Sequence, residues 1–333
     1  MRISVIIPTY NSAPLVVEAV ESVLAQTRPA AEVIVVDDGS TDDTEARLAP
    51  FRDRIQYVRQ PNGRVAAARN TGLRLATGEL IGFLDADDAW HPSKLERQVA
   101  ALESRPDVGL LATGLTAWPG PFAMLADPSA ARINPVSLAE MLLFNPLATS
   151  SIVVRRSIAL RAGPFDTELF GPEDYDLWLR CAQLGQVAVL DEPLTGYRDT
   201  AGSLGKQADT MRRGLLRIHA KLEAAGVWKH RPWFRRKCRA HVDYSTGYMY
   251  FAGGRPEQAL RLLVRSLLTY PLPMWPPAVR YRWGRLRLLL RSAAKSVAGG
   301  PRQVELVGTG NDPGDSVRIE KVPGSVTGEK VQA

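Results

Sequence analysis

The chain has 333 residues, 45% of them hydrophobic, and a formal net charge of +7. This composition excludes a chain that is disordered throughout, and the length leaves room for one large domain and a smaller one. No stretch of about 18 uninterrupted apolar residues occurs, so we expect no membrane-spanning helix. A strand pattern begins directly at the N-terminus, so we expect no secretory signal. Two widely separated cysteines, Cys181 and Cys238, fit neither a disulfide framework nor a zinc site and are typical of reduced residues in a cytosolic protein.

The first 115 residues alternate short apolar strands with helical stretches. Strand patterns occupy the beginnings of residues 2–11, 32–43 and 79–88. Helices are predicted over residues 14–26, 41–49, 64–76 and 92–104. Such alternation predicts βαβ units and an α/β fold with a mostly parallel, twisted sheet flanked by helices.

Acidic side chains follow two of these strands. Because the carboxyl ends of parallel strands line one crevice, these acids and an aromatic residue after the first strand are expected to converge there. Carboxylates without neighbouring Cys or His suit a hard divalent ion such as Mg²⁺ or Mn²⁺, which also binds phosphate oxygens. The alternative is a capping role, which is equally good for Asp37 and Asp88. The residues expected to converge are Tyr10, Asp37, Asp38, Asp85 and Asp87.

The middle of the chain is less regular. Residues 118–146 are Pro-rich and predict either a flap beside a cleft or an ordinary surface connection. A strand is predicted over 149–154 and a helix over 173–184, after which residues 187–197 bring the chain back to the sheet.

Positive charge is concentrated in the next segment. From Lys206 to Lys295 there are 20 Lys and Arg against 4 Asp and Glu, a formal charge of +16. This shift predicts a basic helical domain over 206–298, followed by a disordered tail over 299–333. Residues 244–271 resemble one tetratricopeptide-like helical hairpin, which as a single copy must pack on another part of the chain or on a partner.

Five motifs in the first 200 residues, taken in order, resemble those of the family-two inverting glycosyltransferases, which have the GT-A fold. They lie at residues 8–11, 35–44, 67–72, 83–88 and 171–180. The resemblance implies that residues 1–205 form a GT-A domain with a Rossmann-like nucleotide-binding half. It also implies transfer of a sugar from a nucleotide sugar, expected to be a UDP-sugar, to a hydroxyl of a glycan or lipid-linked acceptor, assisted by Mg²⁺ or Mn²⁺.

The resemblance also assigns roles on the donor side. Asp38 would accept a hydrogen bond from the uracil imide, and Tyr10 would stack on the base. Asp85 would hold the ribose or a metal-bound water, and Asp87 would ligate the metal. Arg69 would reach the phosphates or fix the strand-end carboxylates, whereas Asn70 would serve as a local backbone ligand. The residues expected to bind the nucleotide sugar are Pro8, Thr9, Tyr10, Asp38, Arg64, Arg69, Asp85 and Ala86.

For the general base the resemblance indicates Asp174, with Glu173 assisting or capping the helix; the alternative for both is favourable charge in a first helical turn. An ordinary carboxyl pKa near 4 would leave Asp174 ionised and able to accept a proton at neutral pH. Asp176 and Trp178 would orient the helix or shape the acceptor pocket. Many relatives carry a His shortly after the position of Arg198, and this chain lacks it, so no metal or phosphate contact from such a His is expected. Arg198 itself would face the diphosphate or form a salt bridge at the edge of the core.

Two other functions compete with this interpretation. A sugar nucleotidyltransferase would also use metal carboxylates on an α/β sheet, but residues 8–11 do not form its Gly-rich, basic phosphate loop. A non-catalytic glycan-binding or scaffold protein would be favoured if the acidic positions were not filled.

The basic segment has two interpretations of its own. Residues 275–295 alternate cations with apolar residues and contain Trp275, Tyr281 and Trp283, which suits peripheral attachment to the anionic inner face of the cytoplasmic membrane. The alternative is a helix whose Leu residues pack on the protein. Nucleic-acid binding is not expected, because no recognised module accompanies the charge.

Overall fold

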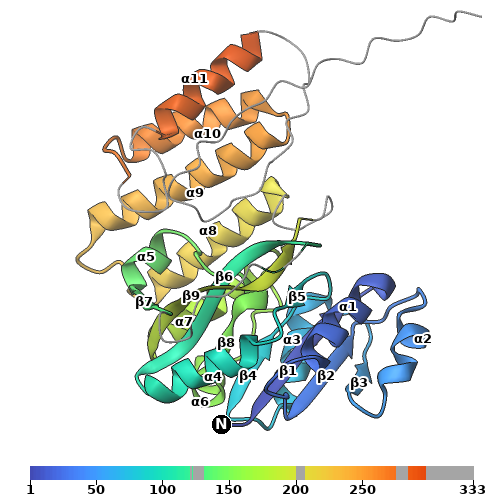
Figure 1. Cartoon of the computed structure of the whole chain (residues 1–333). Coiled ribbons are helices and arrows are strands. Elements are labelled where there is room, and N and C mark those ends of the chain that lie inside the picture. The colour runs from blue at the N-terminus through green and yellow to red at the C-terminus, as the bar shows by residue number, and fades with distance from the viewer. Residues whose placement is uncertain (121, 123–130, 200–206, 275–283, 298–333) are drawn as a thin grey trace, which may run out of the picture.

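A computed structural model describes residues 1–120, 122, 131–199, 207–274 and 284–297 (Figure 1). An α/β part contains the N-terminal strands, and a stack of helices from the C-terminal part extends from it (Figure 1). No helix within the described ranges is both long and apolar enough to span a membrane. The predicted tail over 299–333 lies outside the described residues.

The first half of the sheet is parallel, as predicted. Its strands are β1 (Ile3–Thr9), β2 (Glu32–Asp37), β3 (Gln56–Arg59) and β4 (Leu80–Phe83), in the order β3-β2-β1-β4. Thr9 lies opposite Asp37, so β1 and β2 end together. The loops after β1, β2 and β4 therefore share one edge of the sheet, as is usual for ligand crevices in open α/β folds.

The second half of the sheet is mixed. β8 (Val153–Arg155) lies antiparallel between β4 and β6 (Val108–Trp118), while β9 (Gln186–Arg198) is parallel to β6. Two short strands, β5 (Ala89–Trp90) and β7 (Ile133–Val136), pair antiparallel with β9. Parallel pairing thus holds for β1 to β4 and for β6 with β9. The strand predicted over 149–154 is shorter, because residues Thr149–Ser151 form the 3₁₀ turn η3.

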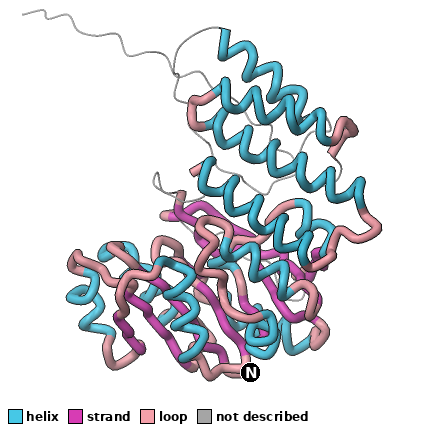
Figure 2. The backbone as a smooth tube through the Cα atoms, turned by 180° about the vertical axis from the view of Figure 1, so that it is seen from behind, coloured by secondary structure: helices cyan, strands magenta, loops and turns pink. Residues whose placement is uncertain are grey.

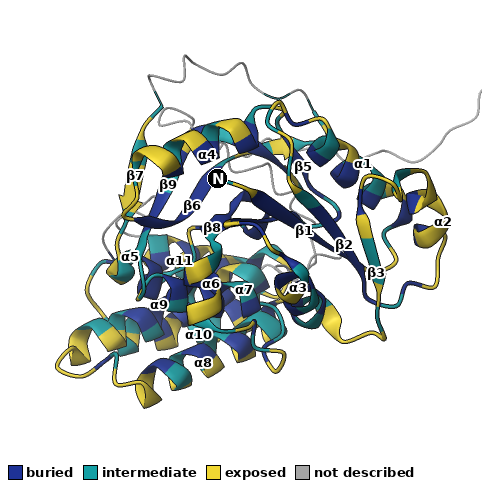
Figure 3. Cartoon of the chain, turned by 90° about the horizontal axis from the view of Figure 1, so that it is seen from below, coloured by how far each residue is buried: buried dark blue, intermediate teal, exposed yellow. Residues whose placement is uncertain are grey.

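Helices cover both faces of the sheet, which explains why the central strands are continuous apolar runs. Ile3, Val5 and Ile7 of β1 face one cluster with α1 (Ala13–Leu24) and α4 (Lys94–Ser104). Ile6 faces the opposite cluster, with α3 (Arg64–Leu75), α6 (Arg156–Ala162) and α7 (Glu173–Cys181). Figure 3 shows these buried strands between the two helical layers. The remaining short elements are α2 (Thr44–Leu48), η1 (Ala49–Phe51) and, within the segment predicted as a flap or connection, α5 (Leu138–Leu143).

The C-terminal helices are α8 (Ala208–Ala224), α9 (Pro232–Ala252), α10 (Pro256–Thr269) and α11 (Gly284–Val297), which stack outward from the sheet (Figures 1 and 2). α9 and α10 form a hairpin around the Gly253-Gly254 turn. Ile218 and Leu222 of α8 and Cys238 of α9 belong to the same hydrophobic cluster as α7, so the first of these helices share the core of the α/β part. A smaller cluster unites α9, α10 and α11.

Candidate active site

A cavity of about 1130 Å³ opens at the edge where β1, β2 and β4 end. It is bounded on the far side by the start of α7 and by α8. All eleven residues predicted as catalytic, nucleotide-sugar-binding or metal-binding line it. They are Pro8, Thr9, Tyr10, Asp38, Arg64, Arg69, Asp85, Ala86, Asp87, Glu173 and Asp174.

The two acids after β2 have different surroundings. Asp38 lines the cavity and accepts hydrogen bonds from Gln60 Nε2 at 2.7 Å and from the Gly63 N–H at 3.0 Å, which orient its carboxylate. Asp37 is buried behind it and accepts from the Ser40 N–H and the Tyr57 hydroxyl. These contacts fix the turn after β2, so Asp37 has the capping role that was the alternative to ligand binding.

Tyr10 and Arg64 are exposed at this end of the cavity. Half of Tyr10 (49%) is exposed, which leaves its ring accessible to a planar ligand. Arg64 begins α3 with a positive φ of 69°, and its guanidinium lies 5.0 Å from the centre of the Phe170 ring. This contact places a cation at the rim of the cavity, near the loop that leads into α7.

Three carboxylates follow β4. Asp85 forms an ion pair of 2.7 Å with Arg69, and its own N–H donates to Ser150 Oγ. Burial and the nearby Asp85 raise the pKa of Asp87 above its ordinary value. Asp88 is buried and accepts from the Ser150 hydroxyl and the Arg198 N–H; burial raises its pKa to about 8. Asp88 thus ties η3 and β9 to the end of β4 instead of capping a helix.

These carboxylates fit a hard divalent cation that is completed by a ligand. In the described part of the chain no cluster of three or more His, Cys, Asp or Glu side chains is arranged to hold a metal by itself. Mg²⁺, however, is commonly bound by one or two carboxylates together with substrate phosphates and water. Asp87 meets this need, because a cation would relieve the cost of its burial beside Asp85, and no other described residue donates a hydrogen bond to its carboxylate.

Arg69 connects the two sides of the cavity. It is buried, and its Nη2 contacts Asp85 at 2.7 Å while its Nη1 contacts Glu173 at 2.8 Å. Its Nε is buried without a hydrogen-bond partner among the described residues. Arg69 was expected either to reach the phosphates or to fix the strand-end carboxylates. Its observed contacts are with carboxylates, as in the second role.

The start of α7 brings the predicted base to the cavity. Glu173 is buried and accepts from Arg69 and from the Gly171 N–H; burial raises its pKa to about 7, against the opposing effect of Arg69. Asp174 is half-buried and accepts from the Thr149 hydroxyl at 2.7 Å and the Tyr175 N–H at 2.6 Å. Burial raises the pKa of Asp174 above the ordinary carboxyl value assumed from the sequence, against the opposing effect of Arg69.

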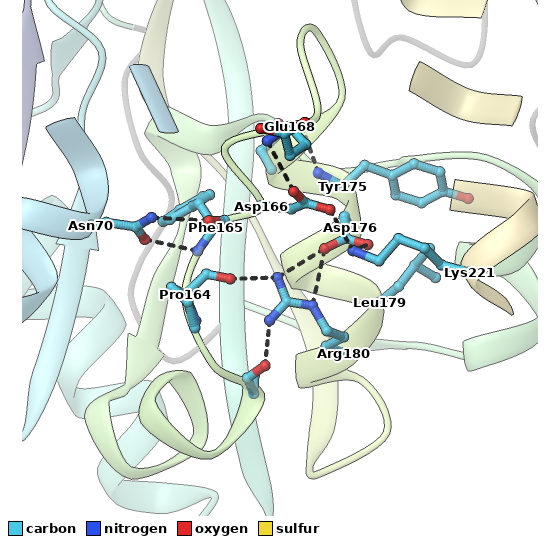
Figure 4. A network of polar contacts seen from close by, with 12 residues as sticks. Asn70, Pro164, Phe165, Asp166, Glu168, Tyr175, Asp176, Leu179, Arg180 and Lys221 are labelled. Carbon is cyan, nitrogen blue, oxygen red and sulfur yellow. Dashed lines mark hydrogen bonds and ion pairs between the residues drawn. The ribbon is translucent and has the colours of Figure 1, made fainter. Parts of the chain in front are cut away.

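A polar network connects α7 and the loop before it to neighbouring helices (Figure 4). Asp176 contacts Arg180 at 2.8 Å and Lys221 of α8 at 2.6 Å, and Lys221 also reaches Asp166. The Asn70 amide both donates to and accepts from the Phe165 backbone, which confirms its role as a local backbone ligand. These contacts fix the loop before α7 to α3 and to α8.

Two residues near the site have structural contacts. Trp178 packs in the core, 5.5 Å from the Phe83 ring, and does not line the cavity, so of its two predicted roles its contacts are those that orient the helix. Arg198 donates to the carbonyl of Asp87 and forms a 2.6 Å ion pair with Glu18. Of the two roles predicted for Arg198, these contacts match the salt bridge.

Other residues that line the cavity were not predicted from the sequence. Thr149 and Ser150 of η3 contact Asp174, Asp85 and Asp88, although this segment was expected to be a strand. Met211 and Leu215 of α8 also line the cavity. A Thr-Ser-Ser triplet before an apolar run was the available signal for η3, whereas none marks α8.

Sequence comparisons give the family. The profile of glycosyl transferase family 2 matches residues 4–122. The amylovoran biosynthesis glycosyltransferase AmsB of Erwinia amylovora is 30% identical over 212 residues, which cover 58% of this chain and 68% of AmsB. An uncharacterized glycosyltransferase of Nostoc sp. is 33% identical over 219 residues, 60% of this chain and 65% of that protein. The chain covers less than two thirds of the Nostoc protein and only 17% to 60% of several Rickettsia glycosyltransferases that it also matches.

The fold has solved counterparts. The crystal structure of TarS of S. aureus in complex with UDP superposes with a TM-score of 0.60, covering 92% of this chain and 94% of that one, at 18% identity. This likeness shows a GT-A-like fold, including the helical C-terminal part. On the profile match, the similarity to AmsB and the cavity at the strand ends, the chain belongs to glycosyl transferase family 2.

Proposed function

We propose that this chain is an inverting glycosyltransferase that moves a sugar from a UDP-sugar to a hydroxyl of a glycan or lipid-linked acceptor. The observation that carries the proposal is one cavity with strand-end carboxylates on one side and a half-buried carboxylate, Asp174, on the other. The family supports sugar transfer over the nucleotidyltransferase and scaffold alternatives. The UDP complex of TarS and the biosynthetic role in the name of AmsB support the donor and the acceptor class.

On the donor side, Tyr10 would stack on the base and Asp38, already oriented by Gln60 and Gly63, would accept from the imide. Asp87, with Asp85 beside it, would hold Mg²⁺ or Mn²⁺, which when bound supplies positive charge for the departing diphosphate. Arg64 would contact the phosphates from the rim. Arg69 keeps Asp85 in place through the ion pair described above.

On the acceptor side, Asp174 would take the proton from the acceptor hydroxyl as the new bond to the anomeric carbon forms. The bond from that carbon to the diphosphate oxygen breaks on the opposite face, which inverts the configuration. The Thr149 hydroxyl and the Tyr175 N–H orient the Asp174 carboxylate for this step.

The test is a donor and acceptor panel. The full chain is incubated with Mg²⁺ or Mn²⁺, a set of UDP-sugars and GDP-sugars, and glycan or lipid-linked acceptors, and nucleoside diphosphate release is measured together with the anomeric configuration of the product. We expect acceptor-dependent release of UDP and an inverted product. Absence of release from every donor, or a retained configuration, would contradict the proposal.

We also propose that residues 275–295 of the helical extension attach the enzyme to the cytoplasmic face of a membrane, as an enzyme acting on a lipid-linked acceptor would require. α11 packs on the chain through Leu288, and its buried Arg285 donates to the Ser266 and Tyr270 carbonyls. Its outer side nevertheless exposes Leu286 (43%) and Leu290 (60%), with Arg287 beside them, whereas the Arg291 guanidinium lies 5.2 Å from the centre of the Phe251 ring. Trp275, Tyr281 and Trp283, which suggested an interfacial position, lie outside the described residues.

A further inference from the structure

Helix α8 belongs to the C-terminal extension in sequence but is built into the α/β core. Ile218 and Leu222 lie in the hydrophobic cluster that contains Trp178 of α7. Lys221 adds ion pairs with Asp176 of α7 at 2.6 Å and with Asp166 at 3.0 Å (Figure 4). These contacts fix α8 against α7, which carries Asp174 at its start.

α8 also lies directly on the loop that precedes Glu173 and Asp174. A Cβ atom on Gly214 would lie 2.4 Å from Pro172 Cδ, and a Cβ on Gly171 would lie 2.8 Å from Met211 Sδ. Gly171 in addition has a φ of +107°, which other residues rarely adopt. The close approach of helix and loop therefore requires glycine at position 214, and the positive φ favours glycine at position 171. A larger side chain at position 214 would push α8 and the Gly171-Pro172 loop apart.

Two side chains of α8 face the cavity. Met211 and Leu215 stand one helical turn apart and line it together with Phe170 and Pro172. These four residues form an apolar wall beside Asp174, and Arg64 contacts this wall at its edge, over the Phe170 ring. The carboxylates of Asp38, Asp85 and Asp87 lie toward the ends of β2 and β4. No charged side chain of α8 lines the cavity, so a ligand bound beside Asp174 would contact α8 through these apolar side chains.

We propose that α8 is the acceptor-side wall of the active site. Met211 and Leu215 contact an apolar surface of the acceptor, either a lipid chain or the carbon-rich face of a sugar ring, and Gly214 is a positioning residue that lets α8 hold the Gly171-Pro172 loop and hence Asp174. This inference rests on the proposed function. It assigns to the extension a part in acceptor selection that is separate from membrane attachment.

The test compares Met211→Ala and Leu215→Ala with Leu216→Ala, a matched control on the same helix that is half-buried and does not line the cavity. The probes are the methyl and octyl glycosides of the acceptor sugar that supports transfer in the panel, and donor affinity is measured by titration with the UDP-sugar. We expect the two wall variants to raise the acceptor KM by about tenfold or more, the size of effect of lost apolar contacts in a pocket. Donor affinity, and both constants of the control, should change by less than about twofold.

A lipid chain and the face of a sugar ring would lead to different changes in the acceptor KM of the two glycosides. An effect on the octyl glycoside alone identifies a lipid chain, and an equal effect on both glycosides identifies a sugar face; either supports the proposal. Unchanged acceptor KM in both wall variants of an active enzyme would overturn it. A wild-type enzyme without transfer to any acceptor would refute the proposed function and this inference with it.

Gly214→Ala tests the positioning role. We expect kcat to fall by about tenfold or more, since small displacements of catalytic groups are costly, while donor affinity stays the same. A variant that folds, as judged by its thermal unfolding, and keeps wild-type kcat would overturn the positioning role. The wall variants decide the proposal if Gly214→Ala does not fold.

Discussion

Arg69 and Glu173 form a buried ion pair of 2.8 Å although 104 residues separate them in the sequence. The same guanidinium contacts Asp85 at 2.7 Å. One cation thus pairs with a carboxylate that follows β4 and with another at the start of α7, the helix that carries the candidate base. The two sides of the cavity are therefore coupled through a single side chain.

Replacing Arg69 with Met should destabilise the protein by about 3–5 kcal/mol, because removing one partner leaves buried carboxylates uncompensated. Adding Glu173→Gln to that variant should restore part of the loss. Arg47→Met is the matched control: Arg47 pairs with Asp43 at the same 2.7 Å distance but on the surface, so its loss should cost about 1 kcal/mol or less. Urea unfolding measures all four proteins. An Arg69 variant as stable as the control would contradict the coupling role.

Asp174→Asn should abolish transfer while UDP-sugar affinity stays nearly intact. The amide keeps the shape of the carboxylate but cannot accept the proton, so kcat and kcat/KM should fall together, by about 10²-fold or more. Steady-state kinetics and donor titration provide the measurements. If more than about a tenth of the turnover remained, the role of base would pass to Glu173.

The pH profile of kcat/KM should have an ascending limb above the ordinary carboxylate range of about 3.9. Burial raises the pKa of Asp174, so the protonated and inactive form persists to higher pH before activity appears. The Thr149 hydroxyl lowers this pKa by donating to the carboxylate, so Thr149→Val should move the limb to higher pH. A limb near pH 4, or one that Thr149→Val leaves in place, would speak against Asp174 as the titrating base.

Asp87→Ala should remove most metal-dependent nucleotide binding. In the motifs around Asp87 no Cys or His can replace a hard oxygen ligand. Titration of UDP with Mg²⁺ or Mn²⁺, and again with EDTA, should show a large difference for the wild-type chain and a small one for the variant. Equal affinities under all four conditions would exclude a metal at this position.

Membrane attachment through residues 275–295 should be reversible and sensitive to salt. Each cation near an anionic surface contributes about 1 kcal/mol and is screened by salt. Co-sedimentation with anionic liposomes at low and high salt compares the full chain with a version that ends near Pro271. Equal pelleting of the two, or binding indifferent to salt and lipid charge, would show that α11 acts only as a packed helix.

The sequence by itself determined the positions of the acids at strand ends and at the start of α7. Strand periodicity and turn residues are local, and parallel strands with helical connections bring their carboxyl ends to one edge. The convergence of Tyr10, Asp38, Asp85 and Asp87 in one cavity could therefore be predicted. The parallel order of β1 to β4 followed from the same alternation.

Only the tertiary structure decided which partner each of these side chains has. Arg69 contacts carboxylates, Arg198 pairs with Glu18, and Trp178 turns into the core, because packing across distant segments selects among partners that are equivalent in sequence. The raised pKa of Asp174 arises from burial, which depends on everything packed around it. The place of α8 beside the base likewise depends on the fit of Gly214 against Pro172, a contact between segments that no local pattern connects.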